Sequence, residues 1–275
     1  MGAVLSRDRG RIALSVLMVA AVTAGEVALP FVIGRALDGF LAGSSRWLVV
    51  LAAIGLSTML IGTTRRVHDV RLYSRIYERV GSAALAQDAG LSASTARLNL
   101  LREVVDFLEY SVPDLVAGLI AFLGTLVFLA RLSLPVFAAA LVMAAVTVVV
   151  YAASTGRTLR FNREYNDEYE RQVDVLRRRD LALATSHIGL LNRWNIRLSD
   201  VDSVNVAVSL SLTAALQVFA IVSAVRGGLD HRVVLAVVLY VFDFAWAASM
   251  LPSSWQQYLR LRDIMGRLRG PEAPA

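Results

Sequence analysis

Residues 134–153, LPVFAAALVMAAVTVVVYAA, form an uninterrupted apolar run, and a long charged segment follows at 154–202. A helix needs ~20 mostly apolar residues to cross the ~30 Å hydrocarbon core of a bilayer. This run reaches that length without help from its flanks, so it predicts a transmembrane helix. The charged segment keeps helical periodicity, which indicates that the helix continues beyond the membrane.

Five other runs share this apolar character, and the hydrophilic gaps between the six runs alternate between short and long. Hydrophobic residues make up 56% of the chain and its mean hydropathy is +0.58, which is too apolar for an ordinary soluble domain. We therefore expect an all-α membrane protein with six transmembrane helices and a long helical hairpin in each long gap. The runs are Ile12–Ile33, Leu48–Ile61, Pro113–Ala130, Leu134–Ala153, Val204–Val225 and Val233–Leu251.

The first run has an alternative interpretation as a cleaved secretory signal, because Arg7, Arg9 and Arg11 precede it. Against this, the run is longer than the apolar core of a signal peptide and contains Glu26 and Pro30. Five more runs follow it. These features favour a retained transmembrane helix.

Arginine accounts for all 28 basic residues, and lysine is absent. With the amino terminus inside, 23 of these arginines fall on the inner side of the membrane, as the excess of positive charge in cytoplasmic loops requires. We therefore expect both termini and both long gaps to lie in the cytoplasm, in a protein of the bacterial inner (plasma) membrane. The arginines left outside are Arg35, Arg46, Arg131, Arg226 and Arg232.

The net charge of +6 does not require a nucleic-acid partner. Segment 65–112 holds seven arginines and six acids, and segment 154–202 holds nine arginines and eight acids. Balanced segments of this kind are typical of solvated helix faces, so we predict no nucleic-acid binding. Cysteine is absent, which excludes disulfides, thiolate metal sites and cysteine nucleophiles.

Apolar stripes in both long gaps have the spacing of helices. Leu98, Leu101, Val105, Leu108 and Val112 alternate at three and four positions, a heptad-like seam that leads into the third run. We expect this stripe and its counterparts to be packing seams between neighbouring helices. The counterparts are Leu72, Ile76 and Val80 with Tyr73 and Tyr77; Phe161, Tyr165, Tyr169 and Val173; and Leu181, Ala184, Ile188 and Leu191.

The centre of each long gap is expected to hold the turn at the tip of a hairpin. Residues 88–95, DAGLSAST, are small or helix-capping, and a weaker turn signal lies around Asp180–Gly189. A helix from Trp47 to about Ala86 would be ~60 Å long, so each hairpin would reach ~25–30 Å into the cytoplasm. The predicted tip contacts to a partner are Gln87, Asp88, Leu91, Asp180, Leu181 and His187, of which His187 has the alternative interpretation of a merely exposed histidine.

Four motifs occur in order along the chain, and together they resemble the transmembrane domain of ATP-binding-cassette (ABC) exporters from about residue 12 to 269. They are LPFVIGRALD at 29–38, STARL at 94–98 with EVVDF at 103–107, REYN at 163–166, and RLRD at 260–263 with RL at 267–268. The resemblance implies the exporter transmembrane-domain fold over residues 1–269, followed by a short tail at 270–275.

The resemblance also carries a departure, because a fused exporter would continue into an ATPase domain. A phosphate-binding loop needs a lysine to reach the β- and γ-phosphates, and this chain has none. The implied protein is therefore a stand-alone permease subunit and not an enzyme. It would bind no cofactor itself, would form the pore as a homo- or heterodimer, and would use ATP and Mg²⁺ through a separate nucleotide-binding ATPase subunit.

Two acids, Glu26 and Asp243, lie inside apolar runs. A charged group in a bilayer costs at least ~2.5–3.5 kcal/mol, so it usually faces a cavity or a partner. Phe242 and Trp246 flank Asp243, and an acid among aromatic rings can attract a cationic amphiphile. With Gln217 of the fifth run, these residues are our candidate substrate pathway. The alternative is that the acids hydrogen-bond neighbouring helices and only fix packing.

Other functions are weighed against the same features. A motor-free membrane scaffold or regulator that keeps the exporter fold would explain the missing ATPase without a partner, whereas the long hairpins disfavour a channel or secondary carrier. His68, His187 and His231 lie in hydrophilic segments without paired acids, so we predict no metal site. Because no histidine lies in an apolar run, intramembrane proteolysis is rejected.

Overall fold

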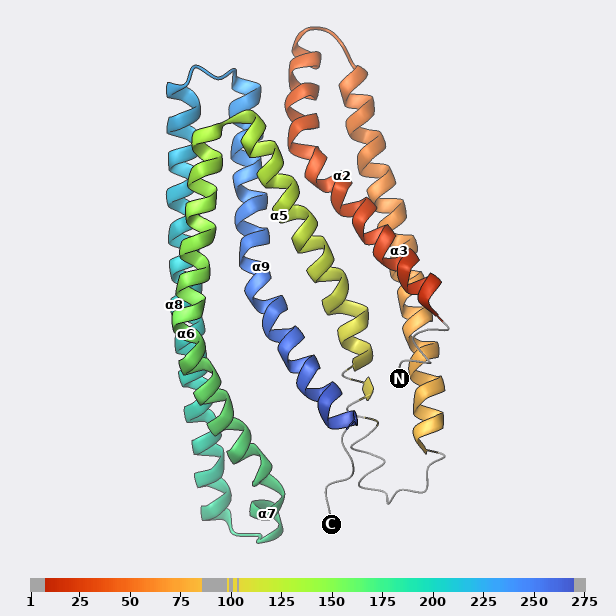
Figure 1. Cartoon of the computed structure of the whole chain (residues 1–275), viewed down its shortest axis with the longest axis vertical. Coiled ribbons are helices and arrows are strands. Elements are labelled where there is room, and N and C mark those ends of the chain that lie inside the picture. Colours follow the sequence, from red (N-terminus) through yellow and green to blue (C-terminus); the bar gives the residue numbers. More distant parts are fainter. Residues whose placement is uncertain (1–7, 86–97, 99–100, 103, 270–275) are drawn as a thin grey trace. The chain divides into compact units, whose positions relative to one another are not determined.

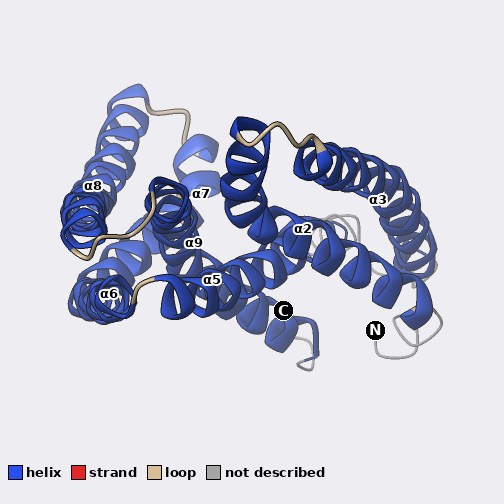
Figure 2. Cartoon of the chain, turned by 90° about the horizontal axis from the view of Figure 1, so that it is seen from above, coloured by secondary structure: helices blue, strands red, loops and turns tan. Residues whose placement is uncertain are grey.

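Every element that the structure describes is helical (Figure 1). The computed structural model describes residues 8–85, 98, 101–102 and 104–269, and Figure 2 shows the same helices from above. The predicted all-α class is confirmed. In chain order the elements are α2 (Arg9–Leu41), α3 (Arg46–Leu85), the π-helical turn η1 (Phe107–Ser111), α5 (Val112–Leu132), α6 (Leu134–Glu170), α7 (Gln172–Arg177), α8 (Leu181–Arg226) and α9 (His231–Arg269).

Among the described helices, six are long and apolar enough to cross a membrane, as the six apolar runs predict. The helices are longer than the runs. Helix α3 contains 40 residues and α8 contains 46, so a rise of 1.5 Å per residue gives lengths of ~60 and ~69 Å. Both lengths are about twice the ~30 Å of hydrocarbon. This confirms that the apolar helices continue well past the width of a bilayer.

The chain divides into two compact units, which are described separately. The first unit comprises residues 1–137 and 220–275, and the second comprises residues 138–219. The first therefore holds α2, α3, η1, α5 and α9, whereas the second holds most of α6 and α8 with α7 between them.

Aromatic rings join three helices in the core of the first unit. Phe128 of α5 lies 6.0 Å from Phe31 of α2 and 4.8 Å from Tyr240 of α9, measured between ring centroids. Phe122 of α5 stacks on Phe244 of α9 at 5.3 Å. Ring pairs at these separations contribute ~0.5–1.5 kcal/mol each beyond the area they bury. The rings thus fix α2 and α9 against α5.

The predicted heptad-like seam is confirmed at the lower end of the first unit. Leu72, Tyr73 and Ile76 of α3 form one buried cluster with Leu101 and Val105. Tyr77, Val80 and Leu108 pack against this cluster, together with Ile12 of α2. The seam therefore encloses apolar side chains on the part of α3 that lies beyond its apolar run.

The turn η1 carries the chain into α5 across a proline. Pro113 has no N–H and cannot donate to the carbonyl of Glu109, four residues earlier. Instead, the N–H of Val112 donates to the carbonyl of Phe107, five residues earlier, which is the π-helical spacing. The chain consequently stays helical from Val104 into α5.

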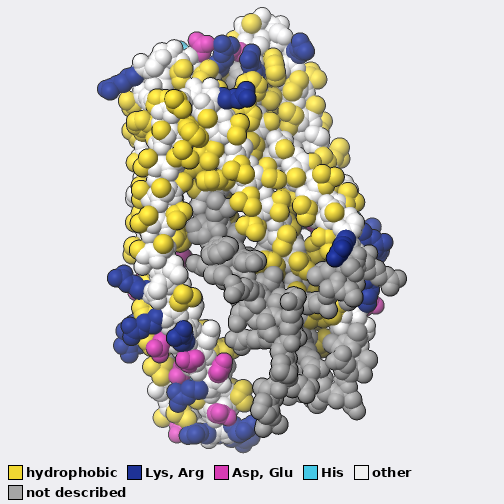
Figure 3. All heavy atoms as spheres, in the orientation of Figure 1, with side chains coloured by type: hydrophobic (Ala, Val, Ile, Leu, Met, Phe, Trp, Pro, Cys, Tyr) yellow, Lys and Arg dark blue, Asp and Glu magenta, His cyan; other side chains and the backbone are white. Residues whose placement is uncertain are grey.

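The second unit is an antiparallel hairpin of α6 and α8. Asn205 Nδ2 donates to Ser154 Oγ at 2.9 Å, and further along the hairpin the rings of Phe161 and Trp194 lie 6.0 Å apart. The guanidinium of Arg197 lies over both rings, at 5.8 and 4.9 Å from their centroids. Figure 3 shows charged side chains gathered at the α7 end of this hairpin and hydrophobic side chains over its other end.

The turn of this hairpin lies earlier than predicted. Arg179 adopts a left-handed φ of 52°, and the carboxylate of Asp180 accepts the N–H groups of Ala182 and Leu183 at 2.9 and 3.2 Å. This N-cap starts α8 at Leu181, so the prediction of a turn around Asp180–Gly189 is wrong. The other predicted turn, 88–95, lies outside the described residues.

The stripes of the second gap form a packing seam only in part. Phe161 packs as expected, but four apolar members of the stripes expose more than half of their side chains. For these four the prediction of a seam within the chain is wrong, because helical spacing gathers residues on one face without supplying a helix to cover it. They are Tyr169, Val173, Leu181 and Ile188.

We predict that Gly124→Ala will lower the free energy of unfolding by ~1–3 kcal/mol, the usual cost of overpacking. A Cβ atom at Gly124 of α5 would lie 2.7 Å from Cγ1 of Val27, a β-branched side chain with little freedom to move. Gly118 of the same helix is the control, because a Cβ atom there meets nothing within 4 Å. Thermal unfolding in detergent measures both variants, and an equal midpoint for the two would contradict this close α2–α5 contact.

Candidate functional site

The acids of the apolar runs, Glu26 and Asp243, lie on two packed helices of the first unit, α2 and α9. Asp243 is half-buried and Glu26 is exposed. The two carboxyl groups are close enough to interact electrostatically as like charges. Arg65 of α3 is close enough to Glu26 to attract it. The structure therefore brings together two acids that the sequence places 217 positions apart.

Small side chains allow α2 and α9 to approach each other near the two acids. Val27, next to Glu26, is buried in one cluster with Ala121 of α5 and Ala247 of α9. Ala247 lies four positions after Asp243, one helical turn further on nearly the same face. The packing of Val27 and Ala247 in one cluster thus brings this part of α2 close to the part of α9 that carries Asp243.

The aromatic residues beside Asp243 do not form a closed cage within the chain. Phe242 and Trp246 are one turn apart on one face of α9, where they leave 53% and 54% of their surfaces exposed. The buried face of the helix carries Tyr240 and Phe244 instead. An exposed aromatic face next to a pair of acids can bind an organic cation through both charge and cation–π contacts.

Gln217 of α8 belongs to the second unit and is half-buried. Its neighbour Leu216 is buried. Participation of Gln217 in the same substrate pathway as Glu26 and Asp243 stays a prediction.

Sequence reasoning missed an ionic cluster formed by Asp38, Asp230 and Arg232, which we call the Arg232 cluster. One NH group of Arg232 donates to Asp38 at the end of α2, and the other donates to Asp230 at 2.8 Å. Nearby, the guanidinium of Arg35 lies over the rings of Phe31 and Trp47, at 5.4 and 5.9 Å. The available signal was Asp38 within the LPFVIGRALD motif, but its partner lies 194 positions away.

The predicted tip contacts of the first hairpin, Gln87, Asp88 and Leu91, lie outside the described residues. In the second hairpin, Asp180 is exposed and caps α8. Leu181 beside it has 82% of its surface exposed. A leucine so exposed at the end of a hairpin is available to a partner protein.

His187 is not an exposed histidine, and that interpretation is wrong. It has 5% of its surface exposed, and its Nδ1 lies 2.6 Å from Oε1 of Glu168. Arg171 holds the other oxygen of Glu168 at 3.2 Å. His187 therefore joins α8 to α6 inside the hairpin, where the register of the two helices, not the sequence around the histidine, puts the acid within reach.

The described residues bring no three His, Asp or Glu side chains together in a way that could hold a metal ion. Among curated proteins, none matches the sequence of this chain. Residues 3–242 match the model of a family described as the ABC transporter transmembrane region. The match begins ahead of α2 and extends into α9, across all the elements between them. With six apolar helices of membrane-spanning length and this match over most of its length, the chain belongs to the ABC transporter transmembrane region family.

Proposed function

We propose that this chain is the permease subunit of an ABC exporter, forms the substrate pathway as a dimer and is driven by a separately encoded ATPase. Family membership supports a transport role. The partner ATPase is supported by one observation, the exposed apolar surface of Leu176 and Leu181 at the end of the second hairpin. In this proposal the family domain covers residues 1–269, and its ATP and Mg²⁺ are bound by the partner.

The second hairpin has the rigidity that a lever requires. Its two helices are joined at three levels, by Asn205 with Ser154, by Trp194 with Phe161, and by His187 with Glu168. Force applied at Leu181 would therefore move α6 and α8 together. The distribution of arginines supports a cytoplasmic position for this end, where closure of an ATPase around ATP would pull on it.

For the substrate, the site favours an organic cation with apolar groups. Glu26 and Asp243 place two carboxyl groups within apolar segments, and Phe242 and Trp246 supply an exposed aromatic surface beside Asp243. Two ionised carboxyl groups repel each other in a medium of low dielectric constant, so a bound cation would be stabilised by both. A neutral amphiphile would gain only the aromatic contact.

We expect the chain, purified gently from native membranes, to carry a nucleotide-binding ATPase, and Leu181→Ser to reduce the bound ATPase about tenfold or more. Truncation of a central apolar contact costs an interface more than ~1 kcal/mol. Ile196→Ser is the control, since Ile196 is an exposed residue of α8 away from the turn. The measurement is the ratio of ATPase to permease by mass spectrometry.

Absence of any ATPase from the native complex would contradict the proposal and favour the motor-free scaffold or regulator. The two variants also separate a specific contact from general damage. If Ile196→Ser reduces the bound ATPase as much as Leu181→Ser does, the hairpin end is not the contact.

Asp243→Asn is expected to reduce transport of a cationic amphiphilic dye about tenfold while transport of a neutral amphiphile changes little. The substitution keeps the side-chain volume and removes the charge that stabilises the cation. Glu26→Gln should act in the same direction, whereas Asp114→Asn, at an exposed acid of α5, should have no effect. Dye accumulation in inverted membrane vesicles measures all three. Equal loss for cationic and neutral dyes would show that Asp243 only supports packing.

A further inference from the structure

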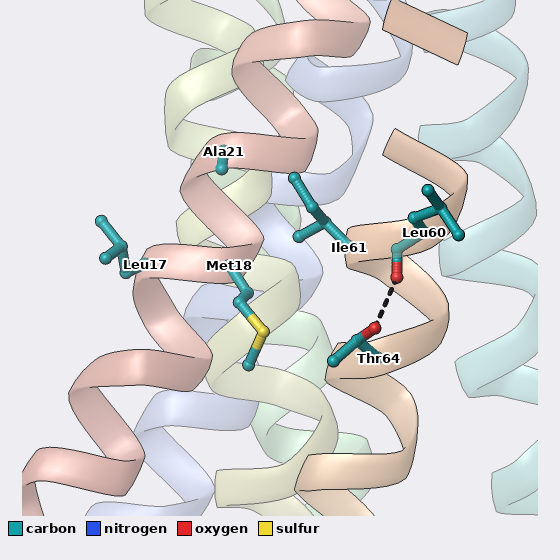
Figure 4. A pocket seen from close by; sticks show the side chains of 6 residues that line it. All are labelled: Leu17, Met18, Ala21, Leu60, Ile61 and Thr64. Atoms are coloured by element: carbon teal, nitrogen blue, oxygen red, sulfur yellow. Dashed lines mark hydrogen bonds between the residues drawn. The ribbon is translucent and has the colours of Figure 1, made fainter. Parts of the chain in front are cut away.

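An apolar groove lies between α2 and α3 in the first unit (Figure 4). Its volume is about 310 Å³. The one hydroxyl in its wall, that of Thr64, donates to the carbonyl of Leu60 at 2.8 Å, so it is satisfied within its own helix. The lining residues are Leu17, Met18, Ala21, Leu60, Ile61 and Thr64.

The groove is open along its side. Leu17 and Leu60 form its edges and expose 65% and 61% of their surfaces. In Figure 4, the side chains of Met18 and Ile61 lie between the two helices. Both helices are of membrane-spanning length and apolarity, so a lipid acyl chain can enter this groove without crossing a polar barrier.

One end of the groove is basic. Arg65 follows Ile61 by four positions and Arg11 precedes Met18 by seven, so each lies on the groove face of its helix. Because α2 and α3 are joined by a short turn and run antiparallel, both arginines lie at the same end. At the opposite end, α2 continues past Ala21 to the acidic Glu26. Arg65 nevertheless acts electrostatically on Glu26, so the two ends of the groove are not electrostatically separate.

Among the described residues, neither arginine has hydrogen-bond acceptors for all of its N–H groups. A guanidinium offers five N–H groups. The nearest acid to Arg65 Nε is Asp69, at 3.7 Å, and among the described residues this nitrogen has no hydrogen-bond partner. Asp69 also has His68 at 3.2 Å. Arg11 shares Asp8 with Arg79, at 3.5 and 2.9 Å, and Glu26 acts electrostatically on Arg65.

We propose that the groove between α2 and α3 binds an anionic phospholipid, with an acyl chain along Met18, Ala21 and Ile61 and the phosphate against Arg65 and Arg11. An apolar channel that ends in guanidinium groups matches such a lipid at both of its parts. A zwitterionic lipid would fill the channel equally well but would gain less at the basic end. In the proposed orientation of the chain, the bound lipid belongs to the cytoplasmic leaflet.

The absence of cysteine allows one fluorophore to be placed in the groove. Ala21→Cys, labelled with bimane, is reconstituted in vesicles that contain brominated phosphatidylglycerol or brominated phosphatidylcholine, and quenching reports the lipid in the groove. The control is Val148→Cys on α6, an exposed residue nine positions from Arg157, as Ala21 is ten positions from Arg11. This places the two labels at similar distances along the helix from an arginine.

The expected result is about fivefold stronger association of phosphatidylglycerol than of phosphatidylcholine at position 21, the factor that one basic residue near an anionic lipid supplies. Arg65→Gln should reduce this preference, Arg11→Gln together with Arg65→Gln should abolish most of it, Arg65→Lys should retain it, and position 148 should show little. Equal quenching by the two lipids at position 21, or a preference of the same size at position 148 or in Arg65→Gln, would overturn the proposal. The measurement needs no ATPase and no transport, so its outcome is independent of the proposed function.

Discussion

A bilayer covers ~30 Å of a helix, and this limit governs both units, because α3 and α8 are about twice that length. The remainder of each helix must stabilise its side chains without lipid. In the first unit this is done by apolar packing, with Leu72 and Ile76 against Leu101 and Val105. The second unit relies more on polar contacts between its helices, such as His187 with Glu168. The two units thus stabilise the parts of their helices outside the lipid in different ways, by apolar packing in the first and by polar contacts in the second.

The features that could be predicted from sequence are those that depend on one helix or on adjacent ones. Apolar run length predicted the six helices, and the 3-4 spacing from Leu98 to Val112 predicted a seam that the cluster at Leu101 and Val105 confirms. The same spacing misled at Ile188, because a stripe identifies a face without saying what covers it. Asp180 and Arg179 fix the second turn through one cap and one left-handed residue, signals too small to stand out in a charged segment.

In the candidate site, too, single residues could be predicted from the sequence but their pairing could not. Glu26 and Asp243 stood out singly, since a charge in an apolar run is costly wherever it occurs. Their interaction depends on the packing of Val27 with Ala121 and Ala247, and alanine in an apolar helix carries no information about its neighbour. Ion pairs between distant helices could not be predicted either, because the sequence does not show which helices pack together. Arg232 is separated from Asp38 by 194 positions, and only the register of α2 against α9 relates them.

That register gives α2 and α9 one ion pair, Arg232 with Asp38, and one pair of like-charged groups within electrostatic reach, Glu26 and Asp243. From Glu26 to Asp38 is 12 positions on α2, and from Arg232 to Asp243 is 11 on α9, or ~18 and ~17 Å along antiparallel helices. The ion pair attracts, whereas Glu26 and Asp243 repel each other when both are ionised. The aromatic stack at Phe128, aided by the exposed Arg232–Asp38 pair, acts against that repulsion. A cation bound between the acids, as proposed, would remove the repulsion without disturbing the Arg232–Asp38 pair, so binding there would tighten α2 on α9.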